Sequence, residues 1–188
     1  IDHNENEKTI YVTISPLKSI VEHITCGDYN VEVIVPDGAS PETYEPTAKQ
    51  LTAFSSAEQI YAIGLINFEL SLIEHISDTE RITNLSNGIE LIEGSCSHGH
   101  HHHSHGVDPH IWTSPSALKT MVEAIRSTTM RMHPDSTKYS AAADKLINDI
   151  ESLDNLCNNM ISSADIKAIM IYHPAYTYYA RDYGINQI

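Results

Sequence analysis

The sequence predicts an α/β fold of two βα lobes with parallel sheets, joined by a long rigid helix, with the second lobe largely missing from this chain. Strand and helix patterns alternate between residues 9 and 85, which is typical of βα units around a parallel sheet. An uninterrupted helical pattern then covers 135–163 and would span roughly 40 Å at 1.5 Å per residue. Only one further βα unit follows. Because parallel sheets are normally covered on both faces, 164–188 is interpreted as the start of a second lobe.

The first lobe is expected to occupy 1–134 and to include a His-rich loop at 95–107. Its strands are predicted from short β-branched and aromatic runs, and its helices from apolar residues at steps of three and four. Pro46 is expected in the first turn of the second helix, since proline suits that position. The expected strands are 9–14, 29–35, 59–63 and 82–85, and the expected helices run from Ser15 to the Gly27-Asp28 step, then over 47–57, 67–76 and 115–132.

The linking helix is expected after a break at His133-Pro134, with Asp135 or Ser136 as its N-cap. Its apolar positions alternate by four and three, which indicates a seam along one long partner surface. An ordinary core helix is the alternative, but a strut between two lobes explains the length better. The seam comprises Tyr139, Ala143, Leu146, Ile150, Leu153, Cys157 and Met160. Beyond it the sequence predicts a strand at 168–172, a short aromatic helix and the opening of another strand at Ile185.

The composition of the chain argues against some classes of function and favours others. A formal net charge of −14 argues against nucleic-acid binding, which requires Lys and Arg to neutralise phosphates, and favours attraction of cations. No apolar run approaches membrane-spanning length. The polar start fits either a cytosolic protein or an exported one whose signal peptide has been removed. The three cysteines cannot all pair within one chain; Cys157 is expected in the core, and Cys96 is a candidate soft ligand.

The stretch 95–112, SCSHGHHHHSHGVDPHIW, holds seven of the twelve histidines. Neutral imidazole suits zinc, copper and nickel, and neighbouring Gly and Ser leave the backbone free to wrap an ion. A solvated polar loop is the alternative, but the position of the run within the chain favours auxiliary metal capture. The candidate capture residues are His98, His100, His101, His102, His103 and His105. His110 differs from them because Pro109 restricts the backbone and the apolar Ile111 should dock.

Three further groups lie where ligands bind in open α/β sheets, beyond the carboxyl ends of strands. Glu42 follows the second expected strand, His110 follows the fourth, and His173 directly follows the strand IKAIMIY. One carboxylate and two imidazoles from three strand-end loops make a plausible set of ligands for a divalent cation. A lone histidine at a strand end is more often a hydrogen-bonded structural residue, and Glu45 is the local rival of Glu42.

Three motifs together resemble the metal-specific solute-binding proteins of bacterial ABC importers, the ZnuA- and TroA-like family. They are DPHIW at 108–112, PETYEPT at 41–47 and YHPAY at 172–176, with ARDYG following at 180–184. The match runs in order over nearly the whole chain. The resemblance implies two βα lobes joined by a long rigid helix, with the metal in the cleft between them.

The resemblance also implies site residues. His110 and His173 match ligand positions of the family, whereas Glu42 stands where the loop motif usually has histidine. A carboxylate can still bind zinc at about 2.0–2.2 Å. The family's fourth ligand, an acidic residue of the second lobe, would lie beyond Ile188. We expect Zn²⁺ as the transported ligand, because nitrogen-rich ligands favour zinc over manganese, with Mn²⁺ as the alternative because carboxylate oxygens suit it.

The expected function is that of an extracytoplasmic zinc receptor, periplasmic and with a lipid anchor as an option, that delivers Zn²⁺ to a membrane ABC permease. A zinc-dependent hydrolase is a distant alternative, since three protein ligands and an open position can also activate water. The sequence lacks HExxH and offers no obvious general base, so no enzymatic activity is expected. A cytosolic zinc buffer that uses only the His-rich loop is a third possibility.

Overall fold

A four-stranded parallel sheet lies at the centre of the larger lobe. The computed structural model describes residues 8–74, 76–93 and 106–188. The strands are β1 (Thr9–Val12), β2 (Asn30–Val33), β3 (Gln59–Ala62) and β4 (Ile82–Asn84), in the order β2-β1-β3-β4. All four residues of the interior strand β3 are buried. This is the burial expected of a parallel strand that is covered on both faces.

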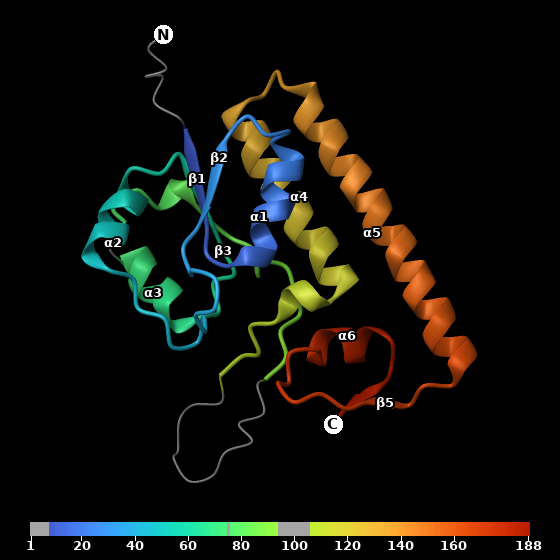
Figure 1. Cartoon of the computed structure of the whole chain (residues 1–188). Coiled ribbons are helices and arrows are strands. Elements are labelled where there is room, and N and C mark those ends of the chain that lie inside the picture. The colour runs from blue at the N-terminus through green and yellow to red at the C-terminus, as the bar shows by residue number, and fades with distance from the viewer. Residues whose placement is uncertain (1–7, 75, 94–105) are drawn as a thin grey trace.

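Helices cover both faces of this sheet (Figure 1). They are α1 (Ser15–Ile24), α2 (Ala48–Ser55), α3 (Asn67–Glu74) and α4 (Pro115–Met132). Figure 1 shows α2 and α3 on one side of the strands and α1 and α4 on the other. The apolar face of α1 turns toward the core, where Leu17, Val21 and Ile24 are fully buried, and α4 buries Met121 and Ile125 in the same layer. Because the four strands are parallel, the loops that follow their carboxyl ends leave the sheet along one edge.

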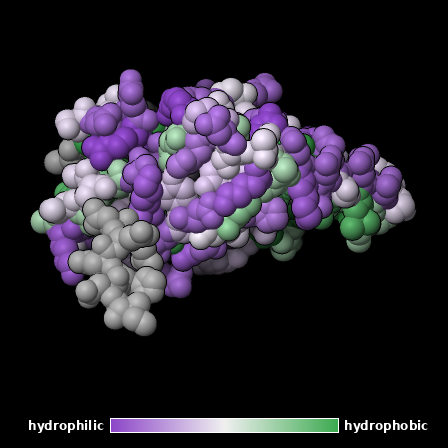
Figure 2. Space-filling model, turned by 90° about the horizontal axis from the view of Figure 1, so that it is seen from above, coloured by the Kyte–Doolittle hydropathy of each residue, from purple (hydrophilic) through white to green (hydrophobic). Residues whose placement is uncertain are grey.

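The long helix α5 (Thr137–Ala164) packs on α4 and α1 over its first half and then extends beyond the larger lobe (Figure 1). Tyr139, Ala143 and Ile150 are buried, but Leu153 is 49% exposed and Met160 is 60% exposed. The predicted continuous seam was therefore wrong beyond Ile150, because these two apolar side chains stay exposed even though the Tyr183 hydroxyl donates to Asp154 on this part of the helix. Figure 2 shows an area of hydrophobic surface near the narrow end of an otherwise largely hydrophilic face.

A smaller parallel sheet follows α5. It consists of β5 (Ala168–Ile169) and β6 (Asn186–Gln187), connected by α6 (Thr177–Asp182). The predicted α/β class, with parallel sheets and a long helix between them, is confirmed, whereas the domain boundaries at 134 and 163 stay a prediction. Among the described residues, no helix combines the length and apolar character needed to cross a membrane.

Several expected boundaries and roles were wrong in detail. The strands are one to three residues shorter than predicted, and two unpredicted 3-10 turns occur, η1 (Thr79–Arg81) and η2 (Ile111–Thr113). Pro46 precedes the cap of α2, because Thr47 and Gln50 form a capping box and Thr47 is the N-cap. Ser136 precedes α5 as predicted but makes no side-chain cap bond.

Cys157 is half-buried on α5 and hydrogen-bonds the Tyr179 and Tyr183 side chains, so it is not the core residue that was expected. Its position on the exposed half of α5 explains the difference. Cys96 lies outside the described residues, and its role as a soft ligand stays a prediction.

One buried carboxylate shapes the turn between β3 and α3. The Glu69 side chain is fully buried and accepts hydrogen bonds from four consecutive backbone N–H groups, those of residues 63–66, at 2.7–3.1 Å. Burial raises the pKa of Glu69, while the hydrogen bonds from the backbone of Ile63, Gly64 and Ile66 act in the opposite direction. Gly64 is required in this turn, since it has φ +79° and a Cβ there would lie 2.2 Å from the Asn84 side chain. The turn thereby presents Ile66 to the site described next.

Candidate metal centre

Three side chains from three separate loops meet beyond the carboxyl ends of the strands. Glu42 comes from the loop after β2, His110 from the segment between β4 and α4, and His173 from the segment after β5. One ligand atom from each lies within 4.8 Å of the other two. The Nε2 atoms of the two histidines are 3.1 Å apart, and their rings meet edge to face with centroids 5.0 Å apart. The structure thus brings together the three candidates that the strand-end rule selected.

Contacts within the protein hold the His110 side chain in place. The residue is only 9% exposed, and the Asp108 carboxylate accepts hydrogen bonds from both its backbone N–H, at 2.9 Å, and its ring Nδ1–H, at 2.6 Å. A carboxylate on one ring nitrogen selects the tautomer whose other nitrogen, Nε2, is free to ligate a metal. The adjacent Ile111 is fully buried, which anchors the loop as the sequence indicated.

Asp108 is itself kept ionised by these contacts. Burial alone would raise its pKa, but hydrogen bonds from the His110 ring, the His110 backbone and the Thr177 hydroxyl leave the pKa of Asp108 below its ordinary value. An ionised Asp108 fixes the orientation of the His110 ring and makes it a stronger electron donor to a metal ion.

Glu42 and His173 are exposed, unlike His110. Both line a cavity of about 240 Å³ whose walls also include Pro41, Ile66 and Trp112. The backbone turns sharply after His173, where the Ala175 N–H donates to the His173 carbonyl at 2.7 Å, and this turn aims the ring back at His110. An ion could therefore reach the three ligands from solvent and be partly enclosed by apolar side chains.

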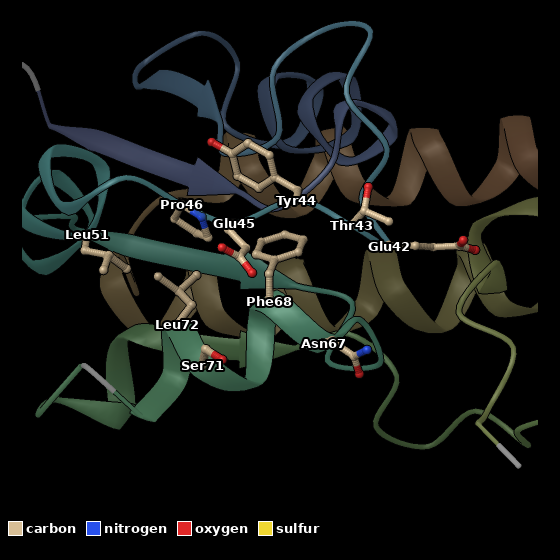
Figure 3. A pocket seen from close by; sticks show the side chains of 10 residues that line it. All are labelled: Glu42, Thr43, Tyr44, Glu45, Pro46, Leu51, Asn67, Phe68, Ser71 and Leu72. Atoms are coloured by element: carbon tan, nitrogen blue, oxygen red, sulfur yellow. The ribbon is translucent and has the colours of Figure 1, made fainter. Parts of the chain in front are cut away.

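The positions of the two side chains distinguish Glu42 from Glu45 as the candidate carboxylate ligand. Glu45 lines a neighbouring cavity of about 400 Å³, with Tyr44 and Phe68 among its other walls. Figure 3 shows the Glu45 carboxylate beside the Phe68 ring, whereas the Glu42 carboxylate points away from the other labelled side chains. Glu42 alone of the two shares a potential ion position with the histidines.

The predicted auxiliary capture residues lie outside the described residues; they are His98, His100, His101, His102, His103 and His105. The segments that flank them are paired. Glu93 bridges to Val107 in antiparallel fashion, and the Asp108 N–H donates to the Ile92 carbonyl at 2.9 Å. Auxiliary metal capture by the His-rich loop stays a prediction.

Sequence reasoning missed the residues of α6 that support the site. Tyr178 is fully buried against Asp108, and the Asp182 carboxylate accepts a hydrogen bond from Ser114, the N-cap of α4. The run YTYYARDY was interpreted only as a short aromatic helix. Its one available signal was the density of hydroxyl-bearing aromatic side chains, which need hydrogen-bond partners when they are buried.

Residues 10–188 match the family model described as "ZnuA: Zinc-uptake complex component A periplasmic". The chain belongs to this family. The resemblance carried by the DPHIW, PETYEPT and YHPAY motifs is thereby confirmed.

Individual relatives agree with this assignment. The zinc-binding protein AdcA of Streptococcus pyogenes serotype M3 is 26% identical over 203 residues, which are 98% of this chain and 39% of that protein. The high-affinity zinc uptake system protein ZnuA of Bacillus subtilis is 27% identical, with 100% of this chain and 62% of that protein covered. A crystal structure of ZnuA superposes with a TM-score of 0.82 at 29% identity, covering 97% of this chain and 70% of that one. The chain thus spans well under two thirds of the first of these relatives.

Proposed function

We propose that this chain captures Zn²⁺ in an extracytoplasmic compartment, as the receptor of an ABC importer, and delivers it to a membrane permease. The observation that carries the proposal is the convergence of Glu42, His110 and His173, whose ligand atoms lie within 4.8 Å of one another. Within the part of the chain that the structure describes, no other group of three His, Cys, Asp or Glu side chains comes as close. Relatives named for zinc binding and zinc uptake support the same cation.

The chemistry of the ligands suits zinc. Two imidazole nitrogens and one carboxylate oxygen provide three of the four positions that tetrahedral Zn²⁺ normally takes. The buried pair of Asp108 and His110 corresponds to the carboxylate–histidine arrangement that orients zinc ligands in proteins. The exposed side of the cavity leaves a route for the ion to enter and leave, which a delivery protein requires.

Manganese is the second candidate, and the observation that favours it is Glu42. A carboxylate in place of a third imidazole adds a hard oxygen donor, and such donors suit Mn²⁺. Two nitrogen ligands still favour zinc in the affinity order of the divalent metals. We therefore propose zinc as the principal ion.

Binding without chemistry is the proposed activity. A hydrolase would need a general base beside the metal-bound water, within hydrogen-bond reach of it. Asp108 is already committed to the His110 ring and backbone, and Glu45 belongs to the neighbouring cavity. Glu42 serves as a ligand in this proposal, so it does not supply the base.

Competition titration of the full chain with a chromogenic chelator tests the proposal. We expect one tight zinc equivalent, weaker binding of manganese, and additional weak zinc equivalents that vanish when 97–106 is deleted. The tight equivalent should survive that deletion. Absence of a tight equivalent in the intact chain would refute the proposal, and loss of the tight equivalent with the loop would move the site into the loop.

Delivery is tested in cells. A bacterial strain that lacks its own zinc receptor but retains the permease of this chain should regain growth under zinc limitation when the chain is expressed with an export signal. His110→Ala should fail to restore growth at equal protein abundance. Equal growth with and without the wild-type chain would contradict the proposed transport role.

A further inference from the structure

The buried Tyr178 hydroxyl joins two backbone segments that flank the metal centre. Tyr178 lies on α6 and is fully buried. Its hydroxyl donates to the Asp108 carbonyl at 2.7 Å and accepts from the Ile92 N–H at 3.1 Å. A buried hydroxyl that is satisfied by two backbone groups is costly to displace, since each group would lose a hydrogen-bond partner.

Asp108 connects this hydroxyl to a ligand. While its carbonyl binds Tyr178, its carboxylate binds the His110 ring at 2.6 Å and the His110 N–H at 2.9 Å. A displacement of the Asp108 backbone would therefore turn the imidazole. The Tyr178 hydroxyl thus constrains the orientation of His110 without touching it.

The other ligand histidine lies just before the helix that carries Tyr178. His173 comes immediately before the turn that leads into α6, and the Ala175 N–H within that turn donates to the His173 carbonyl. The far side of the turn is also fixed, because the Tyr176 N–H donates to the Gln187 side chain at 2.7 Å. The Tyr178 hydroxyl therefore links the His173 segment to the backbone of the His110 loop.

We propose that Tyr178 is a positioning residue for metal binding, which keeps the imidazoles of His110 and His173 facing one another before an ion arrives. This inference deepens the proposed function and rests on it for the consequence in metal affinity. Holding ligands in the bound arrangement raises affinity because the cost of ordering them is already met in the free protein. The 3.1 Å separation of the two Nε2 atoms is the arrangement that Tyr178 maintains.

The surroundings of Tyr178 make the hydroxyl separable from the packing of α6. Arg181 donates to the Glu90 carbonyl at 2.9 Å and lies over the Tyr178 ring, 5.2 Å from its centroid. Ser114 also donates to Asp182. These contacts hold α6 in place independently of the hydroxyl, so Tyr178→Phe should keep the helix docked.

The matched control is Tyr183→Phe. The Tyr183 hydroxyl donates to Asp154 on α5 at 2.9 Å and so leads away from the ligands. We expect the zinc affinity of Tyr178→Phe to fall by roughly threefold to tenfold, at or below the range for groups that directly orient a ligand, and that of Tyr183→Phe to stay within about twofold of wild type. The visible absorption of the Co²⁺-loaded full chain should change in Tyr178→Phe alone, since those bands report ligand geometry. Wild-type affinity together with a wild-type cobalt spectrum in Tyr178→Phe would overturn the inference.

A measurement without metal separates this inference from the proposed function. In the metal-free full chain, NMR should detect proximity between the His110 and His173 rings in wild type and Tyr183→Phe, and weaker proximity in Tyr178→Phe. If wild type binds no zinc and this pattern still holds, the transport proposal fails while the positioning role stands. Unchanged proximity in Tyr178→Phe overturns the positioning role whatever the zinc result.

Wild-type protein alone provides a second check that does not depend on the folding of any variant. The Ile92 N–H should exchange slowly with deuterium in the metal-free chain, because the Tyr178 hydroxyl holds it. Exchange as fast as that of an exposed amide would overturn the inference.

Discussion

The side chains of His110 and Glu42 meet at the same candidate metal position, but His110 is buried and Glu42 is exposed. His110 is buried, its ring and backbone are bound by one carboxylate, and its neighbour Ile111 is fixed in the core. Glu42 is exposed and extends from a loop into solvent-accessible space, as does His173. The comparison teaches that a site can combine one rigid ligand, which contributes orientation, with exposed ligands, which contribute access. Four predictions test this division.

The largest effect is expected from His110→Ala. Removal of the rigid ligand also leaves the buried Asp108 carboxylate without its ring partner, so zinc affinity should fall by more than about a hundredfold, beyond the range for outer-sphere groups. Competition titration measures the loss. His23→Ala, which removes an exposed histidine on α1, is the control and should bind like wild type. A tenfold or smaller loss in His110→Ala would contradict the central role of the rigid ligand.

Asp108→Ala should have the next largest effect. The His110 ring would lose the acceptor that selects its tautomer, and zinc affinity should fall roughly tenfold to a hundredfold. Ser140→Ala, on the first half of α5 and remote from the site, is the control and should keep wild-type zinc affinity. If Asp108→Ala keeps full affinity, orientation by Asp108 is not what distinguishes His110 from Glu42.

Glu42→Ala should cost less, because water can take the place of an exposed ligand. We expect a loss of roughly tenfold, at the lower end of the range known for supporting groups. Glu45→Ala is the matched control, since it removes a carboxylate from the same loop but from the neighbouring cavity. Glu42→His should increase preference for zinc over manganese, because it replaces an oxygen donor with nitrogen. Equal losses in Glu42→Ala and Glu45→Ala would show that the carboxylate acts only through general charge.

The smallest effect concerns stability and lies at the other end of α5. Hydrogen bonds from Lys138 and Tyr139 hold the pKa of Asp28 below its ordinary value. A lowered pKa means that the stabilisation is present above the pKa of the unfolded chain, about 3.9, and is lost as pH falls through the lower folded value. Asp28→Asn should therefore lower the free energy of unfolding at pH 7, by no more than about 1 kcal/mol for so exposed a pair.

Denaturant titrations at pH 7 and below pH 4 check this difference, which should shrink in acid. Glu151→Gln, an exposed charge change on α5, is the control for net charge. Zinc affinity should be unchanged in both variants. A drop in zinc affinity in Asp28→Asn would show that the contrast within the metal centre depends on distant parts of the fold.

Much of the fold could be predicted because local patterns and tertiary structure agree. The helix at 115–132 was predicted with its observed bounds, since Pro115 follows the capping Ser114 and the apolar face is continuous. The seam of α5 was wrong beyond Ile150 because periodicity shows that a face is apolar but not whether anything covers it. Leu153 and Met160 continue the pattern and remain exposed.

The convergence of Glu42 and His110 followed from the sequence because carboxyl ends of parallel strands share one edge of a sheet. His173 follows a strand of the separate, smaller sheet, so its approach to the other two depends on how the two sheets are placed. Sequence also determined the residue types, and hence the range of suitable metals. Only the tertiary structure decided that Glu42 rather than Glu45 reaches the histidines, and that Tyr178 binds both Asp108 and Ile92. The physical reason is that the direction of a loop carboxylate and the partner of a buried hydroxyl depend on contacts between residues far apart in the chain. Local propensity carries no information about such contacts.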